Sequence, residues 1–179
     1  MFLENIMKKT SHNTDEGAIR ALFEKVTSRL IAQGLTISTM ESCTSGFVAS
    51  LLTDREGASA VYKGGFVTYS NEAKIKAGVP EEIINCYGVY SPETAKAMAD
   101  AARKAFDTDI AIGITGTFAN EDPVNSDSKA YTVYVCVMFR EKIFEEKLDL
   151  SELKESDRYE MKLYAAGEVC RIIDENFPG

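Results

Sequence analysis

Segments patterned as strands alternate along this chain with segments patterned as helices, and this alternation restricts the folds that it can adopt. The expected strands are 35–40, 66–69, 110–114, 131–139 and 143–150. The expected helices are 15–33, 47–53, a short one after Asn71, one from Ser91 to Phe106, and 156–175. Strands that alternate with helices, followed by a hairpin, predict an α/β fold with helices on both faces of the sheet. We therefore expect a three-layer α/β/α sandwich around a mixed, mostly parallel sheet.

Residues at the helix ends support these assignments. Gly34 supplies a stop after the first helix, and Ser91, followed by Pro92, is a strong helix start. Asn71 and Ser156 are the expected N-caps of the short helix and the last helix. The length of 179 residues fits one domain. We expect residues 1–13 to form a frayed leader and residues 14–179 a single domain.

Composition narrows the partners and the cellular compartment. The net charge of −8 argues against binding along a nucleic-acid backbone, which needs basic side chains to neutralise phosphates. No apolar run approaches the roughly 20 residues of a membrane span, and the N-terminus lacks the apolar run of a signal peptide. We therefore expect a cytoplasmic protein that binds no nucleic acid and no membrane. A homo-oligomer is expected on general grounds.

Cysteine and histidine usage argues against a metal cofactor. Four cysteines are widely scattered, and the chain has one histidine, His12, in the polar leader. A zinc site needs closely spaced ligands of these types, so we expect no metal and no other cofactor. In a reducing compartment the cysteines should be thiols, most of them buried.

Polar residues follow three of the expected strands and predict a small-molecule site. They are Ser42 to Gly46, Ser70 to Lys74, and Thr115 with Gly116. In open α/β sheets, ligands bind at the carboxyl ends of strands, where helix N-termini present free N–H groups. Hydroxyls, a lysine and a glycine at these ends therefore indicate one shared pocket.

The nucleophile of such a pocket is open to several interpretations. A Ser-His-Asp triad is improbable because His12 lies in the leader, but a serine can also be activated by a lysine whose pKa is lowered by burial. Lys74 is the best-placed lysine, and amides around Thr44 to Gly46 would stabilise an oxyanion. Cys43 is the rival nucleophile, although a buried cysteine behind the strand is the simpler interpretation. A serine after a strand is often only an N-cap, and a lysine on a short helix is often only a surface charge.

Two six-residue blocks resemble signatures of the CinA (competence-damage-inducible) family, in its C-terminal domain. Residues 41–46, Glu-Ser-Cys-Thr-Ser-Gly, are similar to the family's Glu-Ser-Cys-Thr-Gly-Gly, with Ser45 replacing a glycine. Residues 69–74, Tyr-Ser-Asn-Glu-Ala-Lys, resemble its second signature, and the spacing to Thr115 also matches. Two ordered blocks are more specific than a single short motif. By eye, the resemblance covers roughly residues 15–177.

The resemblance implies an activity and roles for particular residues. The family hydrolyses the carboxamide of nicotinamide mononucleotide without a metal, giving nicotinate mononucleotide and ammonia, and is similar to Ser-Lys amidohydrolases. On this basis Ser42 would be the nucleophile, Lys74 the general base, and Tyr69 an assisting residue. The substrate-binding residues would be Thr44, Ser45, Gly46, Thr115, Gly116 and Arg158, with Arg158 suited to the phosphate.

The loop 117–130 departs from the family pattern and leaves other functions open. Where the family continues Ile-Ala-Gly-Pro, this chain reads Thr-Phe-Ala-Asn from Thr117 and then brings in the acids Glu121, Asp122 and Asp127. Acids near a phosphate weaken its binding, so hydrolysis of the mononucleotide is expected to be weak. The alternatives are a non-catalytic module that binds a nucleotide or a partner, and an amidase with another substrate.

Overall fold

The computed structural model describes residues 14–119, 122–125 and 128–177. The expected leader, residues 1–13, lies outside this part. In the described chain, five strands form one sheet in the order β2-β1-β3-β4-β5. Their bounds are Ile37–Glu41 (β1), Tyr62–Val67 (β2), Ile110–Thr117 (β3), Thr132–Phe139 (β4) and Lys142–Asp149 (β5). The helices are Glu16–Gln33 (α2), Phe47–Thr53 (α3), Asn71–Lys76 (α4), Glu81–Tyr87 (α5), Pro92–Phe106 (α6) and Arg158–Asn176 (α7), with short 3₁₀ turns at Ala58–Ala60 and Ser151–Leu153.

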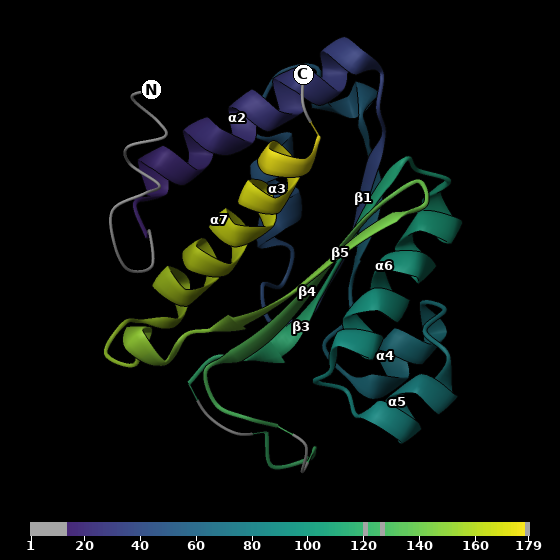
Figure 1. Cartoon of the computed structure of the whole chain (residues 1–179), viewed down its shortest axis with the longest axis vertical. Coiled ribbons are helices and arrows are strands. Elements are labelled where there is room, and N and C mark those ends of the chain that lie inside the picture. The colour runs from purple at the N-terminus through teal and green to yellow at the C-terminus, as the bar shows by residue number, and fades with distance from the viewer. Residues whose placement is uncertain (1–13, 120–121, 126–127, 178–179) are drawn as a thin grey trace.

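The sheet confirms the predicted fold class. β1 pairs in parallel with β2 and with β3, whereas β4 is antiparallel to both β3 and β5. Among the described strands only β4 therefore runs against the others, and the sheet is mixed but mostly parallel. Helices α2, α3 and α7 cover one face, and α4, α5 and α6 cover the other (Figure 1). The result is a three-layer α/β/α sandwich.

The two central strands are the most deeply buried part of the chain. Every residue of β1 and β3 is buried, as expected of strands covered on both faces. Helix α6 packs closely on β3 because Gly113 has no side chain: a Cβ there would lie 2.0 Å from the carbonyl oxygen of Ala95. The carboxyl ends of β1 and β3 are consequently packed between helices on both faces of the sheet.

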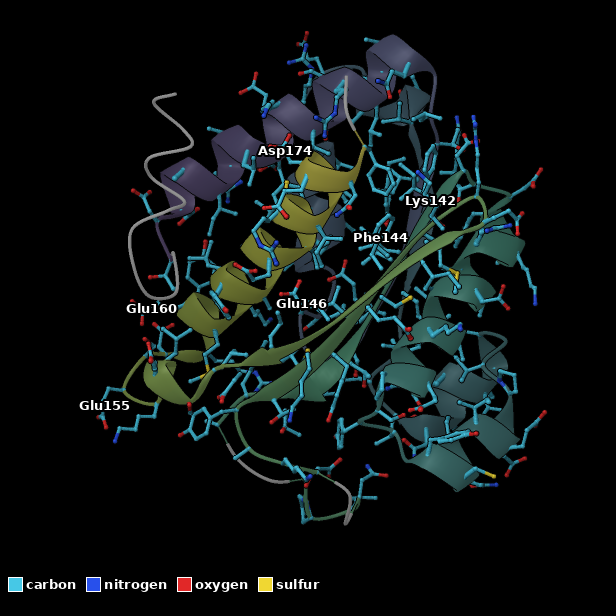
Figure 2. The ribbon with its side chains drawn as sticks, viewed as in Figure 1. Lys142, Phe144, Glu146, Glu155, Glu160 and Asp174 are labelled. Carbon is cyan, nitrogen blue, oxygen red and sulfur yellow. The ribbon has the colours of Figure 1, made fainter. Side chains whose placement is uncertain are left out.

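Ion pairs join the helices of the α2–α7 layer to one another and to the edge strand. Asp174 of α7 binds Lys25 and Arg29 of α2. Arg171 of α7 donates to both carboxylate oxygens of Glu146 on β5, at 2.8 and 2.7 Å. Figure 2 shows Glu146 between β5 and α7, and Asp174 on the side of α7 that meets α2. These contacts fix the direction of α7, whose first residue reaches the functional cavity described below.

Several helix ends were predicted correctly. Gly34 ends α2 in the left-handed conformation, with φ 63°, and Ser91 caps α6 by accepting from the amide of Thr94. Helix α3 has the predicted bounds.

Other boundaries were wrong. Ser70, not Asn71, caps α4, because its hydroxyl accepts from the amide of Ala73. Asp157, not Ser156, caps α7 in a reciprocal capping box with Glu160. Strand β2 begins at Tyr62 rather than at 66, because it pairs along the whole of β1. Helix α5 was not predicted, and β3 continues to Thr117 because β4 pairs with it that far.

In the described part of the chain, no helix has the length and apolar character needed to cross a bilayer.

Candidate functional site

A cavity of about 360 Å³ lies at the carboxyl ends of the parallel strands. This volume is within the range of pockets that bind small molecules. Each of the three segments singled out from the sequence contributes to its lining, through Ser42, Ser70, Lys74 and Gly116 among others. The topology therefore brings together residues that lie more than 70 positions apart in the chain.

Ser42 and Lys74 are in direct contact in this cavity. Lys74 Nζ donates to Ser42 Oγ at 3.1 Å and to the carbonyl oxygen of Thr68 at 2.9 Å. The lysine side chain is 2% exposed, so the surface-charge interpretation does not apply to it. Burial lowers the pKa of Lys74 to about 8, although Cys43 and, to a smaller extent, Asp122 oppose the shift. A substantial fraction of the amine is therefore neutral near physiological pH and able to accept a proton.

Glu41 fixes the turn that carries Ser42. Its fully buried carboxylate accepts from the amides of Gly46 (2.9 Å), Val48 (3.1 Å) and Ala49 (2.8 Å). A carboxylate placed there satisfies the unpaired donors of the first turn of α3 and complements the positive end of the helix. Residues 42–46 are thus held between the end of β1 and the start of α3. In the sequence Glu41 stands out only as the first residue of a motif, and an acid that ends an apolar strand just before a helix is the signal for this role.

The expected amide donors are only partly available. The Gly46 amide is taken by Glu41, and the Ser45 amide donates to the carbonyl oxygen of Ser42 at 3.0 Å. The amides of Cys43 and Thr44 have no acceptor among the described residues. These two amides directly follow the serine and are therefore the better candidates for binding an oxyanion.

The predicted substrate-binding residues divide into two groups. Gly116 and Arg158 line the cavity. The side chains of Thr44 and Thr115 are fully buried, and Thr115 Oγ1 donates to the carbonyl oxygen of Val89 at 3.0 Å. Thr115 therefore supports the wall residue Val89 and does not line the cavity itself. Ser45 and Gly46 lie outside the lining, and Ser45 Oγ accepts from Lys162 Nζ at 3.0 Å.

Arg158 and Tyr69 form one unit on the cavity wall. Arg158 Nη2 donates to the hydroxyl of Tyr69 at 2.7 Å, and its guanidinium lies 5.1 Å from the centre of the Phe118 ring. Among the described residues no salt bridge includes Arg158, so its charge is available to a ligand. Tyr69 contacts Arg158 instead of Ser42 or Lys74. Its geometry favours a role in orienting the arginine.

The divergent loop reaches the cavity through Asp122. Asp122 Oδ2 accepts from the hydroxyl of Tyr90 (2.6 Å) and from the side-chain amide of Asn125 (2.6 Å), while Oδ1 accepts from the amide of Val124 (2.9 Å). These hydrogen bonds, first the one from Tyr90, lower the pKa of Asp122. Asn125 also accepts from Asn71 at the start of α4. The other two acids of the loop, Glu121 and Asp127, lie outside the described residues.

Cys43 borders the cavity, but its side chain is buried in the protein core. It is 3% exposed and packs in the main apolar cluster, as predicted. Burial, with a smaller contribution from Glu41, raises the pKa of its thiol to about 12. Such a thiol is not ionised at neutral pH, which argues against the rival nucleophile. Among the described residues no group of three His, Cys, Asp or Glu side chains is placed to hold a metal, and His12 lies outside them.

Comparisons with known proteins identify the family of this chain. A family model described as "CinA C-terminal domain" matches residues 19–174. A CinA-like protein of Dictyoglomus turgidum is 37% identical over 145 residues, which are 80% of this chain and 34% of that protein. The chain thus spans about a third of the length of such relatives.

Solved structures give the same result. The competence damage-inducible protein A of Klebsiella pneumoniae has a TM-score of 0.79 at 26% identity, over 88% of this chain and 96% of that one. A competence/damage inducible protein of Agrobacterium tumefaciens has a TM-score of 0.75 at 28% identity, over 87% and 95% of the two chains.

The backbone at Ser45 predicts that restoring glycine stabilises the fold. Ser45 has φ 54°, a conformation that is strained for a residue with a Cβ. We expect Ser45→Gly to raise the free energy of unfolding by about 1 kcal/mol, measured by urea denaturation. Gly46→Ala, at φ 89°, is the matched control and should lower it. A destabilised Ser45→Gly variant would show that the contact with Lys162 outweighs the strain.

The burial of Cys43 predicts a simple labelling pattern. Cys86 is exposed, whereas Cys43, Cys136 and Cys170 are buried. An aromatic disulfide reagent added to the native protein should therefore react rapidly with Cys86 alone. The Cys86→Ser variant should show no rapid phase until the protein is unfolded. Rapid reaction at Cys43 in that variant would contradict the buried placement.

Proposed function

Because the chain belongs to the CinA C-terminal domain family, we propose that its cavity hydrolyses the carboxamide of nicotinamide mononucleotide. The observation that carries this proposal is the buried contact between Lys74 Nζ and Ser42 Oγ, at 3.1 Å. A lysine that is fully buried without an acidic partner lowers the stability of the fold, and such residues cluster at functional sites. The family resemblance of the two signature blocks supplies the substrate.

The geometry supports a two-step acyl transfer. With Lys74 neutral, Nζ accepts the proton of the Ser42 hydroxyl while Oγ attacks the carboxamide carbon. The amides of Cys43 and Thr44 would bind the oxyanion of the tetrahedral intermediate. Lys74 then returns the proton to the departing nitrogen, the C–N bond breaks, and ammonia leaves. Water attacks the resulting ester in the same way, which releases the carboxylate product and regenerates Ser42.

The wall of the cavity has a separate task. Arg158, oriented by Tyr69 and stacked on Phe118, is a planar and permanently charged donor that suits a phosphate at the cavity entrance. A second candidate function, an amidase with a different carboxamide substrate, is favoured by one observation: the part of the cavity lining that comes from the loop after β3 departs from the family pattern.

Ammonia release from purified protein tests the proposal. Nicotinamide mononucleotide should be hydrolysed, and kcat/KM should rise as the pH passes through about 8 and then level off, because the neutral form of Lys74 is the base. Ser42→Ala and Lys74→Met should each lose about 10³-fold or more in kcat. Lys76→Met, an exposed lysine on the same helix, is the matched control and should retain the rate. Release from nicotinamide but not from the mononucleotide would select the second candidate.

The buried lysine also predicts how stability depends on pH. The pKa of Lys74 is lowered to about 8 in the folded protein from an ordinary value of 10.5, so between these values the unfolded chain binds more protons. Stability contributed by this site therefore rises with pH across that window, by about 1.4 kcal/mol for each unit of pKa difference. Lys74→Met should be more stable than the wild type at pH 7, and its advantage should shrink towards pH 10. A constant advantage across the window would mean that the lysine is not held in this way.

A further inference from the structure

The cavity receives opposite charges from opposite layers of the fold. Arg158 begins α7, in the layer formed by α2, α3 and α7. Asp122 is bonded to Tyr90, which precedes α6, and is linked through Asn125 to Asn71 at the start of α4. Figure 1 shows α7 and the α4–α6 group on the two faces of the sheet. The cation and the anion therefore approach the cavity from different sides.

Asp122 is an ionised carboxylate without a cationic partner in direct contact. Its donors are a hydroxyl, an amide side chain and backbone amides, all neutral. Among the described residues no salt bridge includes Asp122, while Lys74 and Arg158 are committed to other groups. Lys74 is near enough to interact with this charge but is held by Ser42 and Thr68. An anion that forms no salt bridge on the wall of a small-molecule cavity favours a ligand that carries positive charge.

We propose that Asp122 determines specificity by selecting an aromatic carboxamide whose ring is a cation over a neutral one. The ring would lie towards Asp122, with its carboxamide at Ser42, and an anionic substituent would extend to Arg158. An N-substituted pyridinium carboxamide with a phosphate tail has this order of charges. The inference rests on the proposed function for the position of the carboxamide.

The effect of Asp122 on ligand binding is thus opposite to the effect expected from the sequence. The sequence analysis treated the loop acids as neighbours of the phosphate and predicted weaker binding. In the structure Asp122 is hydrogen-bonded to Tyr90, on the side of the cavity formed by the α4–α6 layer. Arg158, the residue proposed to bind the phosphate, reaches the cavity from the α7 layer on the other side. An acid beside a cationic ring strengthens binding, so its removal should weaken it.

A pair of ligands that differ in one charge tests the proposal. The probes are nicotinamide mononucleotide and benzamide riboside 5′-monophosphate, in which a neutral benzamide ring replaces the pyridinium. Binding is measured by calorimetry with the Ser42→Ala variant, in which turnover is blocked. We expect the cationic ligand to bind roughly five- to tenfold more tightly than the neutral one, a ratio consistent with one partly screened charge pair. The Asp122→Asn variant in the same background should abolish this ratio, mainly by weakening the cationic ligand.

Two further variants separate charge from structure. Asp122→Glu keeps the charge and should retain most of the preference. Glu141→Gln removes one negative charge at an exposed position in the β4–β5 turn, next to Lys142 (Figure 2) and at the opposite end of β3 from the cavity, and should leave the preference unchanged. Thermal unfolding and the affinity for the neutral ligand report whether Asp122→Asn is folded with its cavity intact.

The outcomes are distinct. Equal affinities for the two ligands, or a preference that survives in Asp122→Asn, would overturn the proposal. An equal loss for both ligands would do the same, because it would make Asp122 a structural residue of the loop. Tighter binding of the mononucleotide to Asp122→Asn would place the acid beside the phosphate instead. Because these are binding measurements, they stand even if the wild-type protein releases no ammonia, a result that would refute only the proposed hydrolysis.

Discussion

The geometry of the site depends on the carboxylate of Glu41, which ties the end of β1 to the start of α3. A strand that leads directly into a helix leaves the first amides of that helix without partners, and here three of the amides from Gly46 onwards converge on one buried carboxylate. The five residues between the two elements have little conformational freedom left. Ser42 is the first of them, and its own amide donates to Ile114 of β3 at 3.0 Å. The proposed nucleophile is therefore held by the most deeply buried part of the sheet.

Lys74 is held in place by neutral hydrogen-bond acceptors, although its helix is short and the burial of its charge is unfavourable. Helix α4 spans only Asn71–Lys76, and Ser70 caps its first turn. Lys74 Nζ finds two acceptors, Ser42 Oγ and the carbonyl oxygen of Thr68, and neither is charged. The amide of Thr68 in turn donates to the carbonyl oxygen of Glu41 at 2.8 Å, so the lysine and the serine are positioned from the same strand end. Desolvation, with no carboxylate in direct contact among the described residues, is what moves the pKa of this lysine towards neutrality. A salt bridge would have stabilised the amine as a cation and made it a poorer base.

The sequence predicted the layers and the three strand ends because these follow from local periodicity and from the rule that parallel strands end at one edge. It identified Ser42 and Lys74 for the same reason. It did not predict that Tyr69 contacts Arg158, because an orientation across 89 residues depends on where α7 begins. The cap residues Ser70 and Asp157 were each missed by one position, since neighbouring polar residues are equally good caps by type and only the backbone decides between them. The role of Glu41 was missed because an acid in a motif does not reveal which amides it will meet.

The two departures from the family signatures show why a substitution must be placed before it is interpreted. Ser45 replaces a glycine within six residues of Glu41, yet it lies outside the cavity lining, and its cost is a strained φ on the surface. Asp122 belongs to a loop that shares no signature with the family, yet its carboxylate enters the cavity and is held ionised by its hydrogen-bond donors. From the sequence the first change looked closer to the chemistry. In the structure Ser45 affects the stability of the fold, whereas Asp122 determines the charge that a ligand meets on the cavity wall. The same cavity thus keeps its reactive pair while the charge on its wall is free to change, and selectivity can diverge without any change at Ser42 or Lys74.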